Sequence, residues 1–168
     1  MALSLSGKEF IMPVNKLKHT PDDFSEVTLI GITTSLKDYR LAYFINKETN
    51  LNLERLDDLP VFDEKSKQLN NFSFYRWYDD DQRITYYIIS NEHPGGRMIS
   101  TFQQADYFLL VKGKISDPNL KQLQSLLRSI PSISFVFKAD INKIKELTGI
   151  LYDLELHELS QVSRQAAN

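Results

Sequence analysis

Residues 71–90 read NFSFYRWYDDDQRITYYIIS and decide the fold of this chain. Two stretches of aromatic and aliphatic residues stand on either side of an acidic run, a pattern that predicts two strands joined by a turn. Aromatic side chains bury more apolar area than any others, in a core or at an interface. Seven of them lie in this segment, including the only tryptophan of the chain: Phe72, Phe74, Tyr75, Trp77, Tyr78, Tyr86 and Tyr87.

Side chains alternate across a strand, so the predicted hairpin has two faces. A loop of two or four residues pairs Trp77 with Ile84 and Tyr78 with Arg83. We expect the first face to be the core face, with Tyr75, Trp77, Ile84, Tyr86 and Ile88. The second face has an apolar base and a more polar tip, with Phe72, Phe74, Tyr87 and Ile89 followed by Arg76, Tyr78, Arg83 and Thr85.

The apolar base of the second face needs a cover, which is a helix, the tail of the chain or a partner. We predict that this face is an interaction surface for another protein or for a second copy of the chain. A homodimer would use one patch twice around a two-fold axis. The candidate residues are Phe72, Phe74, Arg76, Tyr78, Arg83 and Tyr87.

Before the hairpin, residues 26–32 are rich in aliphatic and β-branched side chains and are predicted to form a strand. A helix follows to about Lys47, with Ser35 and Asp38 at the spacing of a capping box. Its apolar stripe is predicted to hold Leu36, Tyr39, Tyr43 and Asn46, and Ala42 and Ile45 widen this stripe. A short strand at residues 51–55 then leads into an acidic loop.

After the hairpin, the pattern predicts a strand at residues 106–112 and a helix that begins at Asp117 and Pro118 and ends before Pro131. Another strand covers residues 133–137. Asp140 is predicted to cap a third helix that ends at Gly149, and the tail from Leu151 is also predicted to be helical.

This order of elements predicts an α+β domain with a mixed, largely antiparallel sheet. The sheet contains the aromatic β-hairpin, and two to three helices pack mainly on one of its faces. The single domain is expected to span residues 16–160. Residues 1–15 are expected to be a loose leader, and residues 161–168 a frayed tail.

The composition is that of a globular protein, with 168 residues, 42% of them hydrophobic, and a formal net charge of −2. The absence of cysteine excludes disulfides, thiolate metal sites and a cysteine nucleophile. No apolar run approaches the roughly 20 residues of a membrane-spanning helix, and the first ten residues do not resemble a secretory signal. We therefore expect a cytoplasmic protein that does not bind a membrane.

No motif of an enzyme is visible in the sequence. The three histidines are far apart, and no phosphate-binding loop, dinucleotide fingerprint or nucleophile elbow occurs. We expect no enzymatic activity, no metal and no cofactor. Two polar and aromatic groups remain, Asp38 with Tyr39 and Arg40, and Asp106 with Tyr107. The plain structural roles are a helix cap for Asp38 and a backbone-amide acceptor for Asp106.

Three segments of the chain resemble the bacterial IPExxxVDY family in matching order. They are residues 35–46 (SLKDYRLAYFIN), residues 87–91 (YIISN) and residues 106–109 (DYFL), and the resemblance covers roughly residues 16–150. In the eponymous motif Ile99, Asp106 and Tyr107 fit, whereas Ser100, Thr101 and Ala105 replace the proline, glutamate and valine. The resemblance implies a small cytoplasmic bacterial protein of a family without an established activity.

The sequence thus predicts a non-catalytic module that binds a protein partner, or itself, through the aromatic hairpin. The alternative is binding of RNA or another polyanion by residues 97–145, which hold eight basic residues against three acids. A sequence pI of about 5.9 makes nucleic acid the weaker hypothesis. An enzyme that assembles its site from distant segments ranks third, and convergent Asp, Arg and Tyr groups in a deep pocket would favour it.

Overall fold

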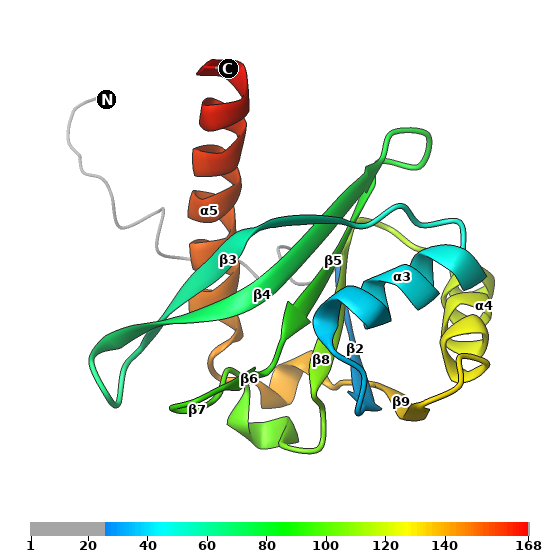
Figure 1. Cartoon of the computed structure of the whole chain (residues 1–168), viewed down its shortest axis with the longest axis horizontal. Helices are drawn as coiled ribbons and strands as arrows, with labels where there is room; N and C mark the ends of the chain where they lie inside the picture. The colour runs from blue at the N-terminus through cyan, green and yellow to red at the C-terminus, as the bar shows by residue number, and fades with distance from the viewer. Residues whose placement is uncertain (1–25, 168) are drawn as a thin grey trace, which may run out of the picture.

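The computed structural model describes residues 26–167, which form one six-stranded sheet and three α-helices (Figure 1). The strand order is β3-β4-β5-β8-β2-β9, and all five pairings are antiparallel. The predicted α+β class with a largely antiparallel sheet is confirmed. The strands are β2 (Val27–Thr34), β3 (Glu54–Asp63), β4 (Gln68–Asp79), β5 (Ile84–Ser90), β8 (Tyr107–Lys112) and β9 (Ile133–Lys138).

The helices divide between the two faces of the sheet. On one face lie α3 (Asp38–Glu48) and α4 (Asp117–Arg128), and on the other lies α5 (Leu147–Ala167). Figure 1 shows α3 and α4 together at one end of the sheet and α5 apart from them. Each face therefore has its own apolar core. Short elements complete the fold: β6 (Glu92–His93), β7 (Gly96–Arg97) and two 3₁₀ turns, η1 (Ser100–Phe102) and η2 (Ile141–Lys143).

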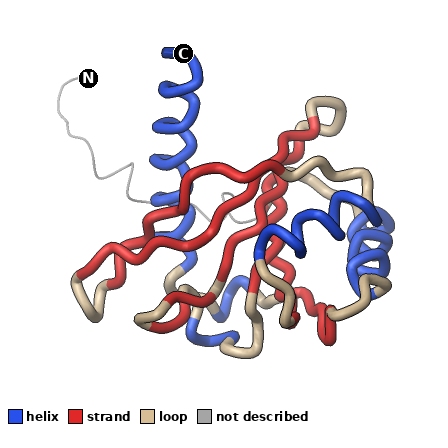
Figure 2. The backbone as a smooth tube through the Cα atoms, viewed as in Figure 1, coloured by secondary structure: helices blue, strands red, loops and turns tan. Residues whose placement is uncertain are grey.

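The aromatic hairpin is formed by β4 and β5, and β4 extends from the β3 turn to the β5 turn (Figure 2). Trp77 pairs with Tyr86 rather than with Ile84, so the predicted register was wrong by two residues. An even shift keeps every side chain on its face, and the two-face division is confirmed. Asp79 sets the register, because its Oδ1 accepts from the amides of Asp81 (3.0 Å) and Gln82 (3.2 Å) at the turn.

The acidic segment after α3 is a strand, not the loop that we predicted. It forms most of β3, the terminal strand beside β4, where Leu59 and Val61 alternate into the core beneath α5. Its acids are placed at the exposed positions, as with Asp57 and Asp58. Local charge suggested a loop, but apolar alternation and eight residues paired with β4, on either side of an irregularity between Leu56 and Leu59, decide the strand.

Two helix predictions need correction. α3 begins at Asp38 without a side-chain cap, and its buried face consists of Leu41, Ala42 and Ile45. Tyr39 and Tyr43 are consequently exposed, because they lie about a quarter turn or more from that face.

The third predicted helix is replaced by a short 3₁₀ turn, which Asp140 caps, and by the long helix α5. Gly149 lies inside α5 and does not end it. The helical tail from Leu151 is confirmed, and α5 also includes residues 161–167, which we expected to fray. The predicted leader, residues 1–15, lies outside the described residues.

Candidate functional site

Helix α5 covers the aromatic base of the predicted interaction face. Phe72 is 2% exposed, and Phe74 and Tyr87 are fully buried. The ring of Phe74 stacks on Tyr87 at 5.7 Å and meets the edge of His157 on α5 at 5.2 Å. These three aromatic residues are therefore not on the surface, since the helical tail of the chain, one of the three covers that we considered, occupies this position.

The polar members of the predicted face lie apart from one another. The Nε atom of Arg76 donates to Glu158 on α5 at 2.6 Å. Tyr78 is 41% exposed, and Arg83 is exposed in the β4–β5 turn with a positive φ of 57°. Burial and the nearby carboxylate of Glu158 raise the pKa of Tyr87. The six candidate residues thus divide into a core, an ion pair and a hairpin tip.

Polar contacts also hold α5 against the edge strand β3. His157 Nε2 lies 2.9 Å from the carbonyl of Asp57, and Asp153 Oδ2 accepts from the amide of Phe62 at 3.3 Å. Arg164 donates to the carboxylate of Asp57, and this hydrogen bond lowers the pKa of that carboxyl group. Side chains of α5 thereby bind backbone groups of β3 and hold the helix at this edge of the sheet.

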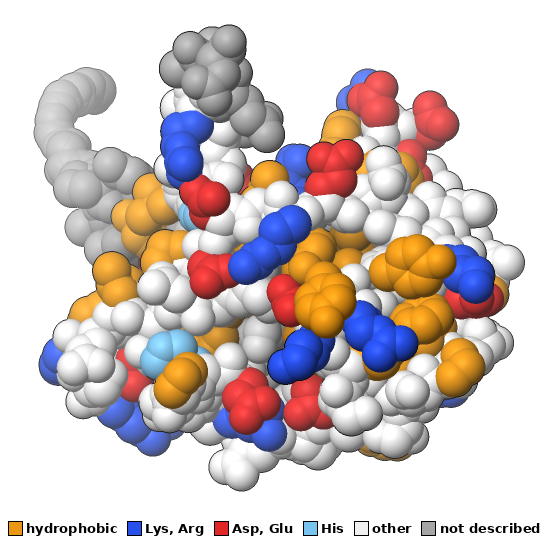
Figure 3. Space-filling view, viewed as in Figure 1, with side chains coloured by type: hydrophobic (Ala, Val, Ile, Leu, Met, Phe, Trp, Pro, Cys, Tyr) orange, Lys and Arg blue, Asp and Glu red, His pale blue; other side chains and the backbone are white. Residues whose placement is uncertain are grey.

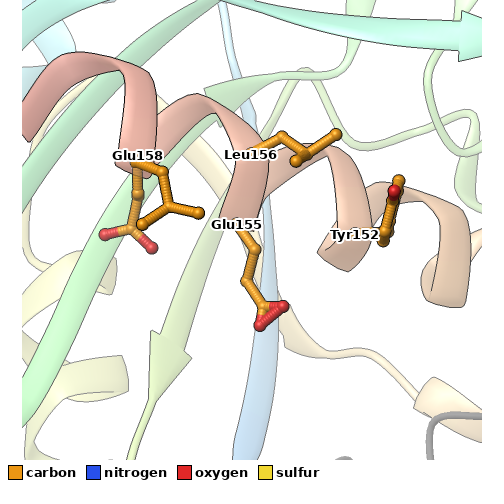
Figure 4. Close-up of a pocket in the computed structure, with 5 residues that line it drawn as sticks. Tyr152, Glu155, Leu156 and Glu158 are labelled. Atoms are coloured by element: carbon orange, nitrogen blue, oxygen red, sulfur yellow. The ribbon is translucent and has the colours of Figure 1, made fainter. Parts of the chain in front are cut away.

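The outward side of α5 carries an apolar stripe that the sequence reasoning missed. It consists of Tyr152, Leu156 and Leu159, whose spacing of four and three residues aligns them on one side of the helix. They are 43%, 49% and 66% exposed and line a shallow groove with Glu155 and Glu158 (Figure 4). The helical spacing of these residues is visible in the sequence. However, α5 has leucines on both sides, and only the packing of the helix shows which of them are exposed.

A second candidate site lies where α3 begins. The hydroxyl of Tyr75 donates to Asp38 Oδ2 at 3.0 Å, and the hydroxyl of Tyr107 donates to the carbonyl of Leu36 at 3.0 Å. Burial raises the pKa of both tyrosines to about 12, and the charge of Asp38 adds to each shift. The tertiary structure thus brings Asp38 of the first polar-aromatic set near Tyr107 of the second, whereas Tyr39 of the first set is exposed on α3.

Neighbouring polar groups of this cluster bind backbone atoms. Asp106 accepts from the amide of Thr34 at 2.9 Å, which confirms its expected role as an amide acceptor. The buried side chain of Asn91 accepts from the amide of Ile99 at 2.7 Å and donates to the carbonyl of Ala105 at 2.9 Å. These bonds fix the loop between β5 and β8 and the start of α3. The hydrogen bonds of this cluster therefore stabilise the fold.

The face that carries α3 shows hydrophobic and basic side chains interleaved (Figure 3). Tyr39 and Tyr43 are 61% and 60% exposed, and the guanidinium of Arg40 lies 5.8 Å from the ring centre of Phe44. Nearby, Arg55 lies over the ring of Tyr75 at 5.5 Å. These contacts place cations on aromatic faces, an arrangement common on protein surfaces.

The basic residues of segment 97–145 are spread over several elements. Arg97 lies 3.7 Å from Asp106, Lys112 ends β8, Arg128 ends α4 and Lys138 ends β9. They do not form one basic surface, so the geometry gives polyanion binding little support.

Among the described residues, no group of three or more His, Cys, Asp or Glu side chains is arranged to hold a metal ion. In the same part of the chain, no helix has both the length and the apolar character needed to cross a membrane. No family model, no curated protein and no solved structure matches the chain.

Proposed function

We propose that this chain is a non-catalytic protein-binding module that binds an amphipathic helix of another protein along the outward side of α5. The observation that carries the proposal is the exposed stripe of Tyr152, Leu156 and Leu159. Burial of large apolar side chains is the main source of affinity at helix-in-groove interfaces, where anchors recur at this spacing. The stripe replaces the hairpin face as the proposed contact surface.

The core does not account for this stripe. α5 already contributes Ile150, Leu151 and Leu154 to the apolar cluster on the sheet, on the other side of the helix. A helix that only covers a sheet needs one apolar side, and its solvent side is usually polar. The second apolar side of α5 therefore supports a function in binding.

Charge favours a basic partner helix over a second copy of the chain. Glu155 borders the stripe and is exposed, and Glu158 lines the same groove. In an antiparallel pair of α5 helices centred on Leu156, the two Glu155 carboxylates would lie within one turn of each other on the same flank and would repel. A different helix that carries lysine or arginine beside its apolar residues would instead place a positive charge next to Glu155.

The test uses two synthetic amphipathic peptides with leucine at helical spacing, one flanked by lysine and the other by glutamate. Fluorescence anisotropy should show tighter binding of the lysine peptide, and the double substitution Leu156→Ser, Leu159→Ser should weaken it about tenfold or more. Leu69→Ser is the matched control, because Leu69 is 63% exposed on β4, away from α5. Equal binding of the two peptides, or an unchanged affinity in the double variant, would refute the proposal.

Analytical ultracentrifugation separates self-association from binding to another protein. The wild type should sediment as a monomer, whereas a dimer that Leu156→Ser dissociates would assign the stripe to a second copy instead. RNA binding by residues 97–145 stays a prediction, tested by titration with single-stranded RNA at low salt. An affinity that falls as salt rises would favour it.

The relation to the IPExxxVDY family and a cytoplasmic location are also proposals. What supports the family is that Ile99, Asp106 and Tyr107, which fit its motif, belong to one hydrogen-bonded cluster around Asn91 and the start of α3. A chain without cysteine requires no oxidising compartment, which supports the cytoplasm.

A further inference from the structure

We infer that β9 is a strand-addition site for an extended segment of another protein in which acidic and apolar residues alternate. In the described part of the chain, β9 is the terminal strand of the sheet and pairs with β2 alone. Terminal strands offer a row of amide and carbonyl groups to which another strand can bind. The inference concerns a surface separate from the stripe on α5.

The register shows which backbone groups of β9 point outward. The amide of Ala139 donates to the carbonyl of Leu29 at 2.8 Å, and Phe137 pairs with Gly31 two residues further along. In an antiparallel pair the bonding residues alternate, so Phe137 bonds to β2. Val136 and Lys138 therefore point their backbone groups away from β2, toward the edge of the described sheet. In agreement, the carbonyl of Val136 accepts from Arg128 Nη2 of α4 at 3.4 Å.

One side of this edge is aromatic. Phe135 is 52% exposed, and its ring stacks on Phe137 at a centroid distance of 5.4 Å. Phe102 continues the row at 5.5 Å from Phe137. Gly31 makes room for this row, because a Cβ atom there would lie 2.2 Å from the ring of Phe137. An added strand would place apolar side chains beside Phe135.

The other side of the edge is basic. Val136 belongs to the core beneath α4, so Lys138, two residues along, points to the same face. Arg128 at the end of α4 contacts the carbonyl of Val136, two residues before Lys138, and both cations are exposed. Acidic side chains of an added strand would meet these two charges, while the alternate side chains would meet the aromatic row.

A second copy of β9 would fit this edge less well. Antiparallel pairing about a two-fold axis at Val136 would bring the two Arg128 side chains together at the axis, because each contacts its own Val136. Like charges at the centre of the contact disfavour that dimer. The observations therefore favour a different protein with acidic residues.

The experiment uses three short synthetic peptides: alternating glutamate and valine, alternating lysine and valine, and a glutamate–valine peptide with N-methylated backbone amides. Isothermal titration with the full chain should show binding of the first peptide only. Nuclear magnetic resonance hydrogen exchange should then show slower exchange at the amides of Val136 and Lys138.

Three substitutions test the three parts of the site. Lys138→Pro removes an outward amide at an exposed edge position, Phe135→Ser removes the apolar contact, and Arg128→Glu reverses a charge. Each should weaken the glutamate peptide about tenfold, and Arg128→Glu should improve binding of the lysine peptide. Lys121→Glu, an exposed position elsewhere on α4, is the matched control and should change neither affinity.

If Lys138→Pro disturbs folding, the Arg128→Glu variant still tests the inference. Only a folded Arg128→Glu variant can bind the lysine peptide more tightly than the wild type does. No binding at millimolar peptide, equal binding of the N-methylated peptide, or the same affinity in Phe135→Ser would each overturn the inference. Concentration-dependent dimerisation abolished by Phe135→Ser would also overturn it, in favour of a second copy.

Discussion

Arg76, toward the end of β4, donates from Nε to Glu158 Oε2 in the fourth turn of α5, at 2.6 Å. The two residues are distant in the sequence, and their contact marks where the tail helix meets the aromatic hairpin. Phe74 and Tyr87 lie buried beside it. The chain itself therefore covers the base of the second hairpin face, whereas Tyr78 and Arg83 at its tip remain exposed.

Breaking this ion pair should destabilise the fold. The side chains of Arg76 and Glu158 are 32% and 17% exposed, so solvent screens them only in part. Glu158→Gln should lower the free energy of unfolding by about 1–2 kcal/mol, measured by urea denaturation. Asp58→Asn is the control, because the Arg55–Asp58 pair is about half exposed and should contribute about 0.5 kcal/mol or less. Equal losses in the two variants would contradict the expected difference.

Truncation of a buried aromatic residue at the base of the second hairpin face should lower the free energy of unfolding. Phe74→Ala removes a fully buried ring and should cost about 3–5 kcal/mol of unfolding free energy. Tyr78→Ala, on the same strand face but 41% exposed, should cost about 1 kcal/mol or less. Thermal denaturation followed by circular dichroism compares the two. A Phe74→Ala protein as stable as the wild type would mean that α5 does not cover this face.

Asn91 should be among the most sensitive polar positions. It is fully buried and its side chain bonds to the backbone at Ile99 and Ala105. Asn91→Ala leaves the buried amide of Ile99 without a partner and removes one of the two donors to the carbonyl of Ala105, which also accepts from Arg97 at 3.3 Å. The variant should lose about 2–4 kcal/mol of unfolding free energy in urea denaturation.

Asn91→Asp adds a test that depends on pH. Burial among carbonyl groups raises the pKa of a carboxyl group, so the folded state of this variant prefers the protonated acid. Its stability should therefore be greater near pH 4 and fall as the pH rises to 7, relative to the wild type. Urea denaturation at both pH values provides the comparison. A stability difference from the wild type that is the same at both pH values would contradict burial of the side chain.

The fold should lose stability in alkaline solution. Tyr75 and Tyr107 have pKa values raised from 10.0 to about 12 in the folded state. The folded chain holds their protons between these values while the unfolded chain releases them, so stability is full below pH 10 and falls as the pH rises toward 12. Tyr75→Phe should reduce the slope of unfolding free energy against pH, and the double variant with Tyr107→Phe should reduce it further. An unchanged slope in the double variant would show that other groups cause the loss.

Local pattern predicted much of the fold because it depends on residues near each other in the chain. The alternation of Tyr75 and Trp77 with Phe74 and Arg76 assigned both faces of the hairpin, and Pro118 marked the start of α4. The register was missed because it depends on how Asp79 binds the turn amides. A two-residue shift leaves the pattern of faces unchanged, so alternation alone does not detect it.

The surfaces were harder to predict than the elements. Ala42 and Ile45 of the predicted helix stripe are buried, but the stripe's Tyr39 and Tyr43 are exposed, and Leu41 completes the buried side instead. A short helix with apolar or aromatic residues on two sides can pack on the sheet with either side. The choice depends on which one meets the sheet, and only the packed structure decides that.

The sequence by itself determined the class of fold, the two faces of the hairpin and most of the elements, since strand alternation, helix spacing and turn residues act over short distances. Only the tertiary structure decided that α5 covers Phe74 and Tyr87, and that Leu156 and Leu159 remain on the surface. The physical reason is that burial is shared between segments distant in the chain. An apolar side chain has the same local pattern whether its cover is its own tail helix or another molecule.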